Sequence, residues 1–91
     1  MSNTMNAQHI LVEHEHQAQD ALKKIEEGVS FDDVAKSFSI CPSGKRGGHL
    51  GVFKKGQMVP DFEKAVLDLD VGDVSEPIKT RFGYHVIKRL G

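Results

Sequence analysis

His9-Ile10-Leu11-Val12 is a short apolar run that contains β-branched residues. A run of this kind predicts a β-strand. Because side chains alternate along a strand, His9 and Leu11 are expected on one face and the other two residues on the opposite face. The run follows a polar N-terminal stretch, residues 1–6, which we expect to be loose. The strand therefore predicts where an ordered domain, residues 7–91, begins.

A second alternating run lies near the end of the chain, over residues 84–90, and predicts the last strand. Here His85 and Ile87 are expected to share a face. Each terminal strand thus carries one histidine among aliphatic neighbours. A buried imidazole needs a hydrogen-bond partner, and the other histidine is the simplest one. The pair is either a structural pair or part of the floor of a site.

Apolar stripes at helical spacing predict three helices between these strands. They are expected over 17–27, after an N-cap at Ser30, and from Val59. Residues 41–48 contain proline and several glycines and predict a loop. Residues 50–53 and the segment from Pro77 predict two more strands. The order β-α-α-β-α-β-β predicts an α+β domain, in which three to four helices wrap a four-stranded, mostly antiparallel sheet.

Composition places the chain among ordinary single-domain proteins. It has 91 residues, a net charge of −1 and 27% charged residues. No strongly basic face is indicated, so nucleic acid is not an expected partner. The single cysteine, Cys41, cannot form an intrachain disulfide, and no signal-peptide core is evident. We therefore expect a cytoplasmic monomer.

Several segments match one family in order and spacing, from about residue 7 to residue 90. They are Ala7–Val12, Ser39–Ser43, Gly47–Gly51, Gly56–Glu63 and Phe82–Ile87. On these segments the chain resembles the parvulins, the small peptidyl-prolyl cis/trans isomerases. The resemblance implies the parvulin or FKBP-like fold, a four-stranded antiparallel sheet wrapped by helices. It also implies a stand-alone catalytic domain that accelerates rotation about X–Pro bonds without a cofactor.

Rotation about a peptide bond has a barrier of about 18–20 kcal/mol because resonance gives the bond double-bond character. The twisted amide has lost that resonance and carries less charge separation than the planar one. A dry apolar pocket that grips proline therefore disfavours the planar state more than the twisted state. The resemblance assigns the proline-binding role to Leu50, Met58 and Phe62, with Phe82 on the rim.

The resemblance also implies four polar catalytic residues, namely His9, His85, Cys41 and Thr80. Proton transfer by the histidines is not the favoured role, because rotation moves no proton obligatorily. Cys41 is expected beside the reacting carbonyl as a polar wall, at a position where some relatives carry aspartate. A nucleophilic role is not expected, since isomerisation needs no acyl-enzyme and no oxyanion-hole motif is present. Thr80 either hydrogen-bonds one histidine or is a surface strand residue.

One branch of the family selects phosphoserine or phosphothreonine through a basic cluster after the first strand. The corresponding segment, residues 13–17, has no arginine or lysine, so a phosphate preference is not expected. Lys45, Arg46 and Arg81 leave room for a mild preference for an acidic or a large apolar residue before proline. His49 stands where relatives usually carry aspartate. Whether this chain has a carboxylate near the loop is therefore in doubt.

Three alternatives remain open from the sequence. The same groove can bind proline-containing segments of protein clients as a chaperone without turnover. His14 and His16 can bind a metal. The favoured interpretation is that they lie in solvent at the start of a helix, and no metal site is predicted. The lysines can form a patch that contacts anionic membranes or acidic proteins weakly. They are Lys23, Lys24, Lys36, Lys45, Lys54, Lys55 and Lys64.

Overall fold

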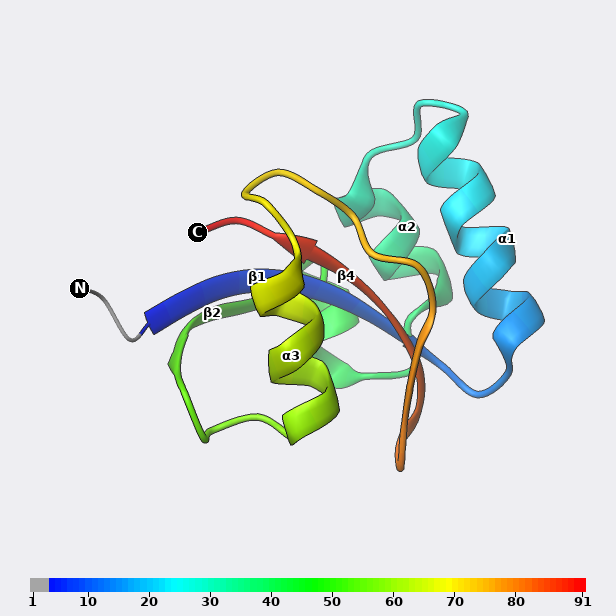
Figure 1. Ribbon diagram of the computed structural model, residues 1–91. Helices are drawn as coiled ribbons and strands as arrows, with labels where there is room; N and C mark the ends of the chain where they lie inside the picture. Colours follow the sequence, from blue (N-terminus) through cyan, green and yellow to red (C-terminus); the bar gives the residue numbers. More distant parts are fainter. Residues whose placement is uncertain (1–3) are drawn as a thin grey trace.

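The computed structural model describes residues 4–91 and shows one antiparallel sheet flanked by helices (Figure 1). The strands are β1 (Thr4–Val12), β2 (His49–Lys54), β3 (Ile78–Thr80) and β4 (Gly83–Arg89). The helices are α1 (Glu15–Glu26), α2 (Phe31–Phe38) and α3 (Pro60–Asp68), with a 3-10 helix, η1, over Pro42–Arg46. Strand order is β2-β1-β4-β3. The α+β architecture predicted from the sequence is confirmed.

The pairing of β1 with β4 at the centre of the sheet sets the position of the histidines. His9 lies opposite Ile87, and Leu11 lies opposite His85. Residues that face each other across two strands point to the same side of the sheet. Both histidines therefore share one face, which agrees with the prediction that each buried imidazole finds its partner in the other.

The two faces of the sheet pack against different helices (Figure 1). Ile10, Val12 and Val86 belong to a core that also contains buried residues of α1 and α2. On the other face, Ile87 belongs to a core with Phe62 and further buried residues of α3. The histidine face is thus the one that α3 covers.

Local sequence features explain where two of the helices begin. The Ser30 hydroxyl accepts a hydrogen bond from the Asp33 amide at 3.1 Å, which confirms the predicted N-cap of α2. Pro60 is the first residue of α3, where its missing N–H costs no hydrogen bond. That placement fixes how far along the sheet Phe62 lies.

Two parts of the sequence prediction are corrected. β1 begins at Thr4, so residues 4–6 are strand rather than a loose tail, and residues 1–3 lie outside the described part. The polar composition of this stretch did not indicate a strand. Met5 is buried and pairs with Phe53 of β2, which is distant in the sequence. The predicted loop contains η1, since Pro42 occupies a first helical turn, where it needs no amide partner.

Candidate active site

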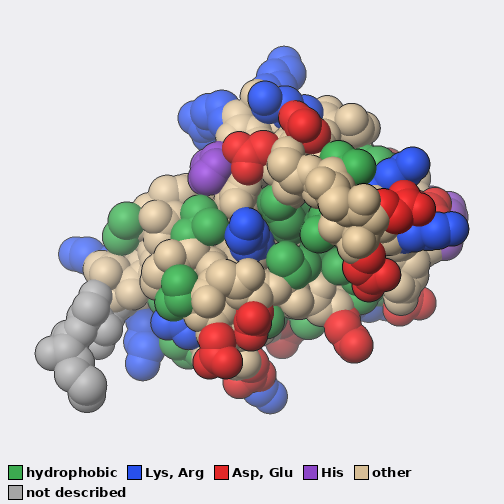
Figure 2. All heavy atoms as spheres, turned by 90° about the horizontal axis from the view of Figure 1, so that it is seen from above, with side chains coloured by type: hydrophobic (Ala, Val, Ile, Leu, Met, Phe, Trp, Pro, Cys, Tyr) green, Lys and Arg blue, Asp and Glu red, His purple; other side chains and the backbone are tan. Residues whose placement is uncertain are grey.

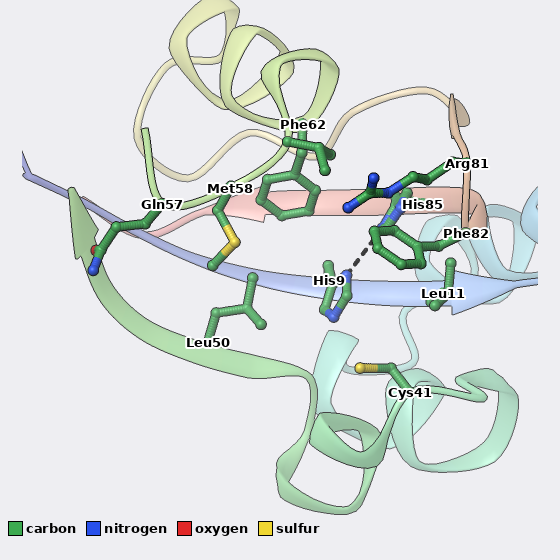
Figure 3. Close-up of a pocket in the computed structure, with 11 residues that line it drawn as sticks. His9, Leu11, Cys41, Leu50, Gln57, Met58, Phe62, Arg81, Phe82 and His85 are labelled. Carbon is green, nitrogen blue, oxygen red and sulfur yellow. Dashed lines mark hydrogen bonds between the residues drawn. The ribbon is translucent and has the colours of Figure 1, made fainter. Parts of the chain in front are cut away.

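A groove of about 350 Å³ opens on the histidine face of the sheet (Figure 3). It lies between α3, the β2 strand and the segment that leads into η1. The side chains that line it are His9, Leu11, Cys41, Leu50, Gln57, Met58, Val59, Phe62, Arg81, Phe82 and His85. The lining therefore includes every site residue predicted from the sequence except Thr80.

The three predicted proline-binding residues converge on one end of this groove. Figure 3 shows Leu50 rising from β2, and Met58 and Phe62 approaching from the start of α3. Phe62 is 3% exposed, whereas Leu50 and Met58 are half-buried and keep accessible surface in the groove. These side chains form an apolar slot with one flat aromatic wall.

The two histidines form the floor beside this slot. Nδ1 of His9 lies 3.0 Å from Nδ1 of His85, and the rings stack with centroids 5.3 Å apart. The Phe62 ring meets both imidazoles edge-on, with centroids at 5.6 Å from His9 and 5.3 Å from His85. The pair that the strand pattern predicts is therefore present, and it contacts the aromatic wall of the slot.

The histidine pair is the centre of a longer hydrogen-bonded chain. On one side, Nε2 of His85 lies 2.7 Å from the Thr80 hydroxyl. On the other, Nε2 of His9 lies 3.2 Å from the Ser43 hydroxyl, which in turn donates to Sγ of Cys41 at 3.3 Å. Thr80 is buried, so its interpretation as a surface residue is wrong.

With the Ser43 hydroxyl as the donor to Cys41, the hydrogen bonds of this chain run in one direction. A hydroxyl has one hydrogen, so Ser43, which donates to Cys41, accepts from Nε2 of His9. Neutral His9 then accepts at Nδ1 from His85, and His85 accepts at Nε2 from Thr80. The Phe82 amide donates to the Thr80 hydroxyl at 3.2 Å and begins the series. The hydrogen bonds thus end on the sulfur that faces the groove.

Burial keeps both rings uncharged at neutral pH. The pKa of His9 is lowered to about 4, first by burial and then by the charge of His85. Burial also lowers the pKa of His85 to about 4. The floor of the groove is therefore polar and neutral. The hydrogen bond between the rings joins two neutral imidazoles, one donating from Nδ1 and the other accepting at Nδ1.

This arrangement predicts that the fold loses stability as the pH falls from about 6.5 towards 4. Unfolded histidine has a pKa of about 6.5, so the unfolded chain binds protons in this window that the folded chain does not. The free energy of unfolding is at its highest above this window. It decreases within the window, by at most about 3 kcal/mol for each histidine. Urea denaturation at a series of pH values measures this.

The exposed His16 supplies the control for that experiment. His16→Gln is expected to leave the pH dependence unchanged, since the side chain is solvated. An unfolding free energy that stays constant between about pH 7 and pH 4.5 contradicts buried, neutral rings. The hydrogen bond from Gln8 lowers the pKa of the Asp32 carboxyl, so this group also loses stability as the pH falls, but it does so mainly below about pH 4, outside the window of the histidines.

Sequence reasoning missed several residues of this site. Ser43 bridges His9 and Cys41, and it lies in a segment already singled out, but only the turn of η1 brings it back to β1. Leu11 shares a face with His9, so the strand alternation was the signal that identifies it. Gln57 also lines the groove, and so does Arg81, which the sequence indicated only as one of three nearby cations. Phe82 is 53% exposed and lies at the rim, as expected.

The departures noted in the sequence lie outside the groove. Oδ2 of Asp32 is 3.4 Å from Nε2 of His49, and its other oxygen accepts from Gln8 at 2.8 Å. A carboxylate is therefore present near this loop, supplied by α2. The rings of His14 and His16 stack with centroids 5.6 Å apart.

Residues 4–91 lack two other kinds of site. No group of three or more histidine, cysteine, aspartate or glutamate side chains there is arranged to hold a metal ion. No helix in the same range is long and apolar enough to cross a membrane.

Comparisons with known proteins agree with this geometry. The model of the Rotamase family, described as the PPIC-type PPIASE domain, matches residues 5–91. The chain is 43% identical over 90 residues to the foldase protein PrsA of Bacillus subtilis, covering 98% of this chain and 31% of the relative. It thus spans about a third of the length of that curated relative.

Solved structures give the same result for the fold. The solution structure of NmPin, the parvuline of Nitrosopumilus maritimus, superposes with a TM-score of 0.89 at 48% identity. The alignment covers 100% of this chain and 99% of that one. The crystal structure of PrsA from Bacillus subtilis gives a TM-score of 0.94 at 42% identity, over 98% of this chain and 35% of that chain.

Proposed function

The chain belongs to the PPIC-type peptidyl-prolyl isomerase family, the parvulins, and we propose that it catalyses cis/trans isomerisation of X–Pro bonds in unfolded or partly folded protein segments. One observation carries the proposal: Leu50, Met58 and Phe62 converge on one concavity beside the buried histidine pair. No covalent step and no cofactor enter the reaction.

The slot acts on the proline side of the bond. A proline ring against the Phe62 wall is held in place, while the preceding carbonyl is free to turn about the C–N bond. The slot is apolar and its floor is uncharged, so it solvates the planar, charge-separated amide less well than water does. The twisted amide loses less by that transfer, and the barrier falls by differential binding.

The polar end of the hydrogen-bonded chain acts on the carbonyl side. We infer that Cys41, which lines the groove, forms a polar wall beside the carbonyl of the residue before proline. The Ser43 hydroxyl donates to its sulfur and holds the side chain in place. His9, His85 and Thr80 act through this chain, so they are positioning residues rather than proton-transfer groups.

Replacing Cys41 by aspartate is expected to retain activity within about tenfold of wild type, because a carboxylate also accepts the Ser43 hydroxyl. Cys41→Ala is the matched control and is expected to lose more, since it leaves that hydroxyl without this acceptor. Isomerisation rates of a proline tetrapeptide measure both. A loss of several orders of magnitude in a folded Cys41→Asp chain contradicts the non-covalent role.

The alternative is a chaperone or peptide-binding module that holds the same segments without turnover. Two-dimensional NMR exchange on an acetylated Ala-Ala-Pro-Phe peptide with catalytic amounts of the chain separates the two. The proposal expects cis and trans signals to exchange on a sub-second scale instead of the uncatalysed scale of about tens to hundreds of seconds. Shifted signals without faster exchange favour the binding module.

We further propose that the chain acts as a monomer in the cytoplasm. One chain supplies the whole groove, and the lone cysteine suits a reducing compartment. A contact between the lysines and an anionic surface stays a prediction. These residues lie on several elements, including α1, α2, η1 and β2. Vesicle co-sedimentation at low and high salt tests it.

A further inference from the structure

Arg81 carries the formal charge of the groove. Of the side chains that line it in the described part of the chain, the others are apolar, amide, thiol or imidazole. His9 and His85 are neutral because their pKa values are lowered to about 4. A ligand in the groove therefore meets one cation and no anion.

The Arg81 guanidinium has no acidic partner within residues 4–91. The ion pairs found there join other residues, and none involves Arg81. Its Cζ atom instead lies 4.9 Å from the centroid of the Phe82 ring, a cation–π contact. The ring supports the guanidinium at the rim and keeps its N–H groups available to a ligand.

The position of Arg81 along the groove determines which residue of the substrate it can contact. Figure 3 shows Gln57 and Met58 at one end of the groove and Arg81 and Phe82 at the other, with His9 between them. A proline ring in the slot places the preceding residue towards the second end, where its carbonyl faces Cys41. The side chain of that residue then reaches the rim at Arg81.

We propose that Arg81 binds the carboxylate of an aspartate or glutamate immediately before proline and so determines the sequence preference of the groove. This assignment rests on the proposed isomerase function. A guanidinium offers paired N–H donors that match a carboxylate. A phosphate dianion fits less well, because residues 13–17 supply no second cation next to the groove.

Acetylated and amidated peptides Ala-Xaa-Pro-Phe, which carry no terminal charge, test the assignment when Xaa is glutamate, glutamine, lysine or phosphoserine. We expect kcat/KM for glutamate to exceed that for glutamine by about threefold to tenfold, and phosphoserine to give no further gain. The ratio should shrink at about 0.5 M salt. Arg81→Gln should bring it close to one, and Arg81→Glu should make lysine the preferred residue.

Arg46→Gln is the matched control, since Arg46 lies on η1 and does not line the groove, and it should leave the ratio unchanged. A merely structural role of Arg81 predicts an equal loss on every peptide, and that result overturns the proposal. So does a glutamate-to-glutamine ratio that survives Arg81→Gln. In a second series, Ala-Ala-Pro-Xaa, an effect of Arg81→Gln confined to glutamate after proline overturns the assignment to the preceding residue.

A failure of the isomerase function is a separate result. If the chain accelerates none of these peptides, the proposed function is wrong, and the dissociation constants of the same peptides then decide the role of Arg81. The dissociation constants must then show the same preference for glutamate, and Arg81→Gln must lose it. Equal dissociation constants for glutamate and glutamine overturn the assignment on their own.

Discussion

Phe62→Ala is expected to lower the free energy of unfolding by about 3–5 kcal/mol and to eliminate most isomerase activity of the molecules that remain folded. The Phe62 side chain is 3% exposed and belongs to the core on the α3 side of the sheet. It is also the wall of the slot and contacts both imidazole rings. Removing it opens a cavity under α3 and leaves the proline without its flat surface.

Phe53→Ala separates the two effects. Phe53 is 4% exposed and packs against Phe62 with centroids 6.2 Å apart, but it does not line the groove. We expect a similar loss of stability, with most of the activity retained per folded molecule. Urea denaturation and kcat/KM, measured where circular dichroism shows a folded chain, give both quantities. Equal activity of the two folded variants contradicts the role of Phe62 as the slot wall.

Gly48→Ala is expected to destabilise the fold by about 3 kcal/mol or more. Gly48 has a φ of +81°, in the left-handed region, and a Cβ there overlaps the carbonyl oxygen of His9. In the native chain the His9 amide donates to the Gly48 carbonyl at 2.9 Å. The added methyl group therefore forces the end of η1 away from β1 at the residue that carries one of the two histidines.

Gly51→Ala is the control that isolates this overlap. Gly51 has a φ of +74°, but a Cβ there meets no atom within 4 Å. Its cost is the backbone conformation alone, about 1–2 kcal/mol. Denaturation curves of the two variants therefore should differ by more than about 1 kcal/mol. Equal losses would mean that the close approach of the η1 end to β1 does not constrain the fold.

The sequence predicted the parts of this protein that depend on local periodicity. Alternation along β1 and along β4 determines which neighbours share a face with His9 and with His85, because the period of a strand is fixed, and the pairing of the two strands then brings both histidines to one face. The cap at Ser30 and the proline at the start of α3 likewise act within one turn. The resemblance to parvulins then placed Leu50, Met58 and Phe62 in one slot.

The parts that were missed depend on contacts between distant segments. Residues 4–6 are polar enough to suggest a tail, yet the amide of Asn6 donates to the carbonyl of Gly91 at 3.2 Å, and β2 pairs with the same stretch. Ser43 reaches His9 across 34 residues through the turn of η1. No pattern within a window of sequence contains these contacts.

The site of proline binding is tested most directly by NMR on the chain saturated with an acetylated Ala-Glu-Pro-Phe peptide. Intermolecular nuclear Overhauser effects report which protein protons lie next to the proline ring. We expect contacts from the proline ring to the Met58 methyl group and the Phe62 ring, with Leu50 on the opposite side. Contacts of that ring with residues outside the groove, such as Val74 and Pro77, would contradict it.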